Sequence, residues 1–386
     1  MTHTDARVTQ TPQATPAGRR LPLLDVLRGV AILGTLMTNV WIFTGPGAEW
    51  GALESGMATG PVESTFGVLA NGKFLSLLTI LFGVGLAIQY DSAKRRGQPW
   101  PGRYRWRALF LFAEGTVHFV LVFAWDVLMG YAVTALLVAR LLTRSERAQR
   151  RVMWWAAGIH LTLMVLLTAA IASSGDGDGD TVSGEVVDLY AHGSYLDQVA
   201  FRLENALALR MEPVLTFFLL LFLFLLGVRL FRAGAFGADE TGRRLRSRLL
   251  AWGIGLGLPL NAAAALVGPD LFLLARYGTA PLLALGYIGL VGAVVDRVRR
   301  PGPLMTGLTS VGRTALSGYV LQNALCVLIS YGIGLGLAER LDDTGPWWVV
   351  ALWATVCAVL MAGSTLWLRR FSTGPLESVQ KWALRH

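Results

Sequence analysis

A histidine with two carboxylates close to it in the chain is the arrangement in this sequence best suited to proton transfer. Glu114 and His118 lie four residues apart in FAEGTVHF and share one face of a predicted helix. Asp126 follows across a predicted tight hairpin formed by Trp125 and Asp126. A carboxylate beside an imidazole fixes its tautomer and raises its basicity, so His118 is a candidate general base oriented by Asp126 or Glu114. The alternative is a buried histidine that only hydrogen-bonds its neighbours.

The apolar runs of this sequence are expected to cross a membrane, and two more polar residues should lie at the same depth in it as His118. Asn39 lies toward the outer end of the first apolar run, and Lys73 begins the second run at its outer end. In an active site, either side chain could stabilise a developing oxyanion. A lysine at the start of an apolar run is also a common interfacial anchor.

Other ionisable and amide groups lie at the inner, cytoplasmic end of the first apolar run and in the middle of a later run. Asp25 and Arg28 in LLDVLRG are three residues apart, so they are expected to pair, either as a helix-entry ion pair or as an anion site facing the cytosol. Gln322 and Asn323 lie mid-run, where amides either bridge helices or line a substrate pathway. No cluster has metal-ligand spacing, so no metal is expected.

The elements that must position these groups are predicted from composition. Of the 386 residues, 54% are apolar and 15% charged, and the mean hydropathy is +0.51. Soluble domains carry about 25% charged residues. We therefore predict an all-α polytopic membrane protein with a lipid bilayer as its partner. Ten apolar runs are long enough to be spans: 25–43, 73–90, 106–124, 126–142, 152–172, 213–231, 247–267, 271–295, 311–336 and 347–368.

The basic residues predict how these runs are oriented. With the N-terminus inside and the runs alternating, 27 of the 34 lysines and arginines fall in cytoplasmic segments and five outside, while Arg28 and Arg313 lie at span ends and are left out of the comparison. That split predicts ten spans with both termini in the cytoplasm. It also accounts for the net charge of +9, so nucleic acid is not expected as a partner.

The runs divide the chain into four predicted parts. Residues 1–20 are predicted to be a disordered cytoplasmic tail, and 21–172 a first half of five helices. Residues 173–212 form a predicted acidic outer loop with an interfacial helix, and 213–386 a second half of five helices. A second weakly apolar stretch, 53–72, is also predicted to be interfacial.

Five blocks of the sequence resemble, in order, the DUF418 (YeiB-like) bacterial membrane proteins. The resemblance runs from about residue 21 to the C-terminus and implies a location in the bacterial cytoplasmic membrane. The blocks are LLDVLRGVAILGTLMTNV, NGKFLSLLTILFGVGLAI, GTVHFVLVFAWDVLMGYAV, VGRTALSGYVLQN and FSTGPLESVQKWAL.

That family is distantly similar to the transmembrane acyltransferases, which include the acyltransferase-3 and heparan-glucosaminide N-acetyltransferase proteins. Those enzymes move an acyl group from cytosolic acyl-CoA to a hydroxyl or amine across the membrane. The shared part is LDVLRG with the following Asn39, whereas residues 40–72 lack the histidine of the lysosomal relatives. Gly318 also stands where the family pattern has Asn.

The resemblance implies an acyl-CoA or acetyl-CoA donor and a small-molecule or glycan acceptor near the outer face. The pyrophosphate of the donor would meet Arg28 and the cytoplasmic Arg103, Arg105 and Arg107, which equally fit plain topology signals. The alternatives are a transporter for a small solute and a structural membrane protein without turnover. Homo-oligomer formation is left open.

Overall fold

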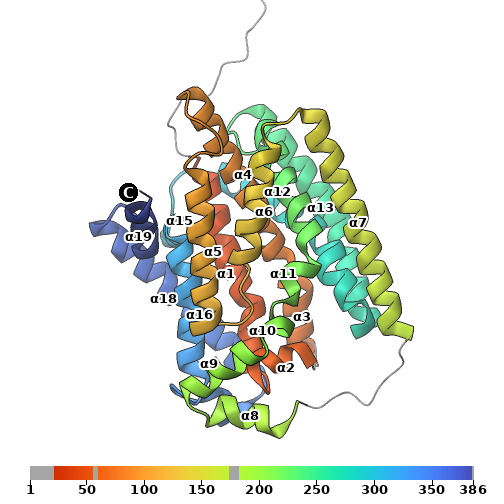
Figure 1. The fold of residues 1–386 in the computed structure, drawn as a ribbon, viewed down its shortest axis with the longest axis vertical. Helices are drawn as coiled ribbons and strands as arrows, with labels where there is room; N and C mark the ends of the chain where they lie inside the picture. Colours follow the sequence, from red (N-terminus) through yellow and green to blue (C-terminus); the bar gives the residue numbers. More distant parts are fainter. Residues whose placement is uncertain (1–20, 55–59, 174–181, 385–386) are drawn as a thin grey trace, which may run out of the picture.

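The computed structural model describes residues 21–54, 60–173 and 182–384, and all regular elements in these ranges are helical (Figure 1). The predicted tail 1–20 and most of the predicted acidic loop, including Asp176, Asp178 and Asp180, lie outside the described residues. The all-α prediction is confirmed.

The helices follow the apolar runs of the sequence, since a run of about 20 apolar residues satisfies its backbone hydrogen bonds in lipid only as a helix. The first half contains α1 (Pro22–Thr44), α2 (Ala48–Glu54), α3 (Pro61–Ala70), α4 (Lys73–Arg95), α5 (Tyr104–Leu121), α6 (Leu128–Leu141) and α7 (Glu146–Ser173). Short helices follow: α8 (Gly184–Ala191), α9 (Tyr195–Glu204), α10 (Ala206–Leu209) and α11 (Met211–Leu215). The second half contains α12 (Phe217–Arg232), α13 (Glu240–Val267), η1 (Pro269–Leu271), the π-helix η2 (Leu274–Thr279), α14 (Ala280–Arg297), α15 (Pro303–Arg313), α16 (Ala315–Ser330), α17 (Leu337–Arg340), η3 (Asp342–Thr344), α18 (Trp347–Arg370) and α19 (Pro375–Ala383).

Six helical segments of the described chain are long and apolar enough to cross a membrane. They are Pro22–Thr44, Pro61–Arg95, Glu146–Ser173, Glu240–Val267, Leu274–Arg297 and Trp347–Arg370. Leu128–Leu141 and Ala315–Ser330 are shorter apolar helices. Six candidate spans support a polytopic membrane protein, while the number ten stays a prediction.

Two sequence-predicted boundaries are wrong. Residues 122–127 join α5 to α6, so the link is longer than the predicted Trp125–Asp126 hairpin. The predicted run 311–336 breaks at Thr314 into α15 and α16 and stops at Ser330. A new helix can start at 315 because a carboxylate from α19 accepts hydrogen bonds from its first amides. The stretch 53–72, predicted to be interfacial, contains α3, which forms one candidate segment together with α4, so its interfacial position stays a prediction.

Helix α1 lies at the centre of the bundle and is packed by α15, α4, α16 and α18. Most of its apolar window is buried, whereas α7 and α13 lie at one side of the molecule and are mostly exposed (Figure 1). Glycines permit the close crossings: a Cβ on Gly29 would collide with the backbone of Leu308, and one on Gly312 with that of Asp25. The central position of α1 brings its polar residues next to those of α4 and α16.

Candidate functional site

The structure brings together the predicted His118–Asp126 pair. His118 lies on the last turn of α5 and is only 2% exposed, and its Nδ1 lies 3.3 Å from Oδ1 of Asp126. The other carboxylate oxygen of Asp126 accepts from the backbone N–H groups of Leu128 and Met129, at 3.1 and 3.3 Å. Asp126 therefore holds the start of α6 and faces the imidazole at the same time.

Glu114 does not join this pair. Both of its carboxylate oxygens are buried without a hydrogen-bond partner among the described residues, and no ion pair links it to His118. The next residue, Gly115, faces Asp126 instead, since a Cβ at Gly115 would lie 2.5 Å from Oδ2. Of the two predicted orienting carboxylates, the structure places only Asp126 against the imidazole.

Helix α16 closes the other side of His118. The side-chain amide nitrogen of Asn323 lies 3.1 Å from Nε2 of His118, and the ring centroid of Tyr319 lies 5.2 Å from that of the imidazole. With the amide donating, Nε2 is an acceptor and Nδ1 carries the proton. The lone pair that a general base needs is therefore occupied by Asn323. Nδ1 lies within 3.3 Å of the Asp126 carboxylate, but neither Nδ1 nor Oδ1 has a hydrogen-bond partner among the described residues.

The neighbouring amide, Gln322, also bridges helices. Its nitrogen donates to the hydroxyl of Thr35 on α1 at 3.4 Å. Gln322 and Asn323 are both fully buried, and neither lines one of the two cavities described below. The contacts favour helix bridging over the predicted substrate pathway.

A cavity of about 280 Å³ approaches Tyr319 from the side of α19. We call it the arginine-lined cavity, after Arg28, Arg107 and Arg313. Its wall also contains one carboxylate, Glu377. The remaining lining residues are Ile32, Leu78, Leu81, Phe82, Gly85, Gln89, Tyr104, Ala108, Leu111, Leu128, Gly312, Ala315, Leu316, Tyr319 and Gln380.

Only part of the predicted cytoplasmic group meets in this cavity. Arg28 pairs with Asp25 at 3.2 Å, as their spacing predicts, and Arg107 donates to Oε1 of Gln89 at 3.3 Å. The other two predicted arginines point elsewhere, since Arg103 donates to the carbonyl of Leu384 at 2.6 Å and Arg105 to that of Gly102 at 3.3 Å. Arg313, which the sequence placed only at a span end, takes a place in the wall.

A second, small cavity of about 30 Å³ has room for about one water molecule. Asn39, Thr38, Trp125 and Val127 line it, and so does Tyr319, which thus borders both cavities. Asn39 therefore lies in a cavity wall next to the link that carries Asp126. Lys73, predicted at the same level, is buried and donates to the carbonyl of Gly67 at 2.9 Å, outside both cavities.

Sequence reasoning missed a polar cluster in the wall of the small cavity. Arg276 on the π-helix forms an ion pair with Glu212 at 2.8 Å, and the hydroxyl of Tyr277 donates to the same carboxylate at 2.6 Å. Arg276 also contacts the side chain of Asn71. Arg276 and Glu212 line the cavity as a balanced pair of charges. In the sequence, this cluster is indicated only by an arginine, Arg276, and an acid, Glu212, in otherwise apolar segments.

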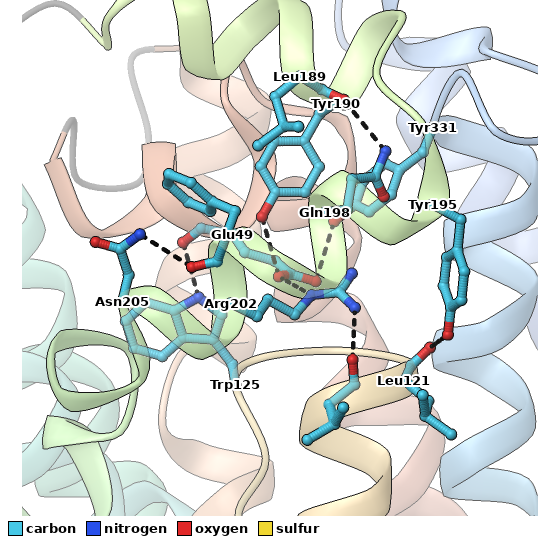
Figure 2. Close-up of polar contacts among 12 residues, drawn as sticks. Glu49, Leu121, Trp125, Leu189, Tyr190, Tyr195, Gln198, Arg202, Asn205 and Tyr331 are labelled. Carbon is cyan, nitrogen blue, oxygen red and sulfur yellow. Dashed lines mark hydrogen bonds and ion pairs between the residues drawn. The ribbon is translucent and has the colours of Figure 1, made fainter.

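A second missed cluster ties the short helices to the link beside the site (Figure 2). Arg202 on α9 and Glu49 on α2 form an ion pair at 2.8 Å, with both side chains fully buried. Arg202 also donates to the carbonyl of Val120 at 3.2 Å, and the indole of Trp125 donates to the carbonyl of Glu49 at 3.0 Å. Burial alone would lower the pKa of Arg202, but the Glu49 carboxylate raises it above its ordinary value, so the guanidinium stays charged.

Comparison with known proteins finds one matching family and two similar bacterial proteins. Residues 230–385 match the family described as "Protein of unknown function (DUF418)". The chain is 27% identical to "Uncharacterized protein YxaH" of Bacillus subtilis (strain 168), over 95% of this chain and 94% of that protein. It is also 27% identical to "Uncharacterized protein YeiB" of Escherichia coli (strain K12), over 92% and 93%. Residues 230–385 are therefore similar to the DUF418 family, and the chain is similar to YxaH and YeiB over most of its length.

Proposed function

We propose that this protein is a membrane acyltransferase that takes an acyl group from cytosolic acyl-CoA and passes it to a hydroxyl or amine near the outer face. One observation carries the proposal. The arginine-lined cavity ends at Tyr319, and the ring of Tyr319 lies against the buried His118–Asp126 pair. A binding site for an anionic donor and a candidate base thus lie on two sides of one aromatic ring.

The arginine-lined cavity suits the donor. Guanidinium groups bind phosphate oxygens with paired, charge-assisted hydrogen bonds, and Arg28, Arg107 and Arg313 stand in the wall. A volume of about 280 Å³ is near the lower end of ligand pockets, which span about 300–1,000 Å³. It has room for the pyrophosphate at the arginines and for the start of the thioester arm, so the acyl end would pass Tyr319 to reach His118.

The chemistry requires His118 to release Asn323. The base removes a proton from the acceptor hydroxyl or amine, whose oxygen or nitrogen then bonds to the thioester carbon. The carbon–sulfur bond breaks, and the leaving thiolate takes the proton back from the imidazolium. Asn39 is placed to donate to the oxyanion from the wall of the small cavity. Rotation of Tyr319 would join the two cavities and expose Nε2.

The test is acyl transfer by the purified protein supplied with acetyl-CoA. A general base is worth about 10²–10⁴-fold in rate, so His118→Ala should lose that much while the protein stays folded. His160→Ala is the matched control, because His160 is an equally buried histidine that bonds only to the carbonyl of Tyr277, at 3.1 Å. Normal turnover in His118→Gln, or equal losses in both alanine variants, would remove His118 from the mechanism.

The donor site has a test of its own. Arg28→Ala and Arg107→Ala should weaken binding of acetyl-CoA, since both arginines line the cavity. Arg105→Ala is the control, because its side chain bonds only to the carbonyl of Gly102. Equal affinity in all three variants would exclude this cavity as the donor site.

A transporter is the second candidate, and the two cavities on either side of Tyr319 favour it. Tyr319 and Leu78 line both cavities, and cavities separated by so few side chains suit a pathway that opens to each side in turn. In proteoliposomes, Tyr319→Ala should then raise leakage of a small solute without acyl-CoA. Unchanged flux, with acyl transfer in the parent protein, would reject this candidate.

We also propose ten spans with both termini in the cytoplasm of a bacterial cell. Helices lie at all ten apolar runs of the sequence, and the basic residues divide unequally between alternate segments. Cysteine labelling in intact cells should reach Asp342→Cys but not Arg147→Cys or Thr241→Cys. The native Cys326 and Cys357 are buried, which keeps the background low. Labelling of Arg147→Cys from outside would overturn this topology.

A further inference from the structure

The C-terminal helix α19 supplies a carboxylate to the wall of the arginine-lined cavity. Glu377 and Gln380 both line it; Glu377 ends the GPLE motif at residues 374–377, and both residues belong to the block FSTGPLESVQKWAL. Helix α19 lies at the edge of the molecule (Figure 1) and packs against α16. The proposed donor site is therefore closed on one side by a terminal element.

Glu377 is held by the first turn of α16. One carboxylate oxygen accepts from the backbone N–H groups of Leu316 and Ser317 at 2.9 and 3.4 Å, and the other from the Ser317 hydroxyl at 2.5 Å. The same hydroxyl accepts from the N–H of Leu376 at 3.0 Å. Gly374 lets this carboxylate lie close to the backbone, since a Cβ there would displace the Glu377 carboxylate from its present position. The conformation of the GPLE block thus places one negative charge at the cavity wall.

The charges of the cavity are unbalanced even with this carboxylate in place. Among the described residues that line it, three arginines face one acid. Arg28 has an ion-pair partner, Asp25, whereas no ion pair within 4.0 Å is formed by Arg107, Arg313 or Glu377. The Nε atom of Arg313 is buried without a hydrogen-bond partner in the described chain. Glu377 partly offsets a positive field that remains available to a stronger anion.

The attachment of α19 is narrow. Most of its residues are exposed, Val379 and Trp382 at 49% and 66%, and only Gln380 is buried. Besides the Ser317 contacts, the carbonyl of Leu384 just after α19 accepts from Arg103. An element with little buried apolar surface opens at low free-energy cost.

We propose that Glu377 is an internal counter-anion of the arginine-lined cavity and that α19 is a plug which a phosphate-bearing ligand displaces. This inference rests on the proposed function for the identity of the ligand, but it concerns anion binding and not acyl transfer. The ligand competes with the Glu377 carboxylate for the field of the three arginines. Removing that negative charge should strengthen anion binding.

The experiment measures binding of inorganic pyrophosphate and of acetyl-CoA to the purified full-length protein. Glu377→Gln should bind pyrophosphate about 10-fold more tightly than the parent protein, because a unit charge at cavity distance is removed. Ser317→Ala keeps the charge of Glu377 but loosens its attachment, so it should also bind more tightly. Glu240→Gln is the control, since Glu240 pairs with Arg244 on an exposed surface of α13.

Opposite outcomes overturn the plug. If the carboxylate only supports α16, Glu377→Gln and Ser317→Ala should both bind more weakly than the parent protein. Unchanged affinity, or no pyrophosphate binding in any of the proteins, would equally contradict the inference. Tighter pyrophosphate binding without acyl transfer would leave the plug standing and reject only the acyltransferase. Should Glu377→Gln fail to fold, Ser317→Ala decides alone.

Discussion

Breaking the buried ion pair between Glu49 and Arg202 should strongly destabilise the folded protein. Glu49 accepts from Nε of Arg202 at 2.8 Å and from the hydroxyls of Tyr190 and Tyr331 at 3.2 and 3.5 Å, and both charged side chains are fully buried (Figure 2). Glu49→Gln keeps the shape of the side chain but leaves the Arg202 charge without a counter-ion. Loss of one partner of a buried pair costs about 3–5 kcal/mol.

The chain offers a control with the same contact in a different environment. Arg244 and Glu240 pair at 2.7 Å, but their side chains are 67% and 75% exposed. Exposed pairs contribute about 0–1 kcal/mol, so Glu240→Gln should leave the melting temperature almost unchanged. Thermal unfolding in detergent, followed by tryptophan fluorescence, compares the two variants. A double change of Glu49→Leu with Arg202→Met should recover much of the loss. Equal melting temperatures for Glu49→Gln and Glu240→Gln would refute the reasoning.

Two further predictions concern local geometry. Gly115→Ala should destabilise the protein by about 1–3 kcal/mol, because the new Cβ would push the Asp126 carboxylate away from its backbone donors. Gly158 lies in open space on α7, so Gly158→Ala should stabilise the protein by about 0.5–1 kcal/mol. Thermal unfolding of both variants tests these opposite signs. Asp197 accepts from the hydroxyl and the N–H of Ser194, which hold its pKa below the ordinary 3.8. Near this pKa the folded form binds fewer protons than the unfolded form. The stabilisation that Asp197 gives to the folded state is therefore fully present above a pH of about 4, and it is lost as the pH falls through the lowered pKa. The melting-temperature difference between the parent protein and Asp197→Asn should shrink between pH 7 and pH 3, and a constant difference would contradict the capping role.

Contacts that are local in the chain could be predicted from the sequence. Asp25 and Arg28 are three residues apart on one helix, and the pair forms. His118 and Asp126 are separated by one short link, which leaves few places for the carboxylate except beside the ring. The helical segments could also be predicted, because an apolar run in a membrane must form its backbone hydrogen bonds within itself, as a helix does.

Contacts between distant segments could not be predicted. Glu49 meets Arg202 across 153 positions, and Asn323 meets His118 across 205. Such partners are set by which helices pack together, and no local spacing encodes that choice. Lys73 shows a different failure, since Gly72, with φ of 77°, turns the chain so that the ammonium reaches the end of α3 instead of the cavity.

Helix α16 connects the features on which both proposals depend. Its first turn holds Glu377 through Ser317, and the next two turns carry Tyr319 and Asn323 against the imidazole of His118. Residues four apart lie on one helix face, so Tyr319 and Asn323 contact the ring together. Release of Glu377 would free the amides of that first turn and weaken the constraint on the helix start. Under the two proposals, binding of an anion at the arginines and exposure of Nε2 would be linked through this one helix, and His118 would become a usable base only with the donor in place.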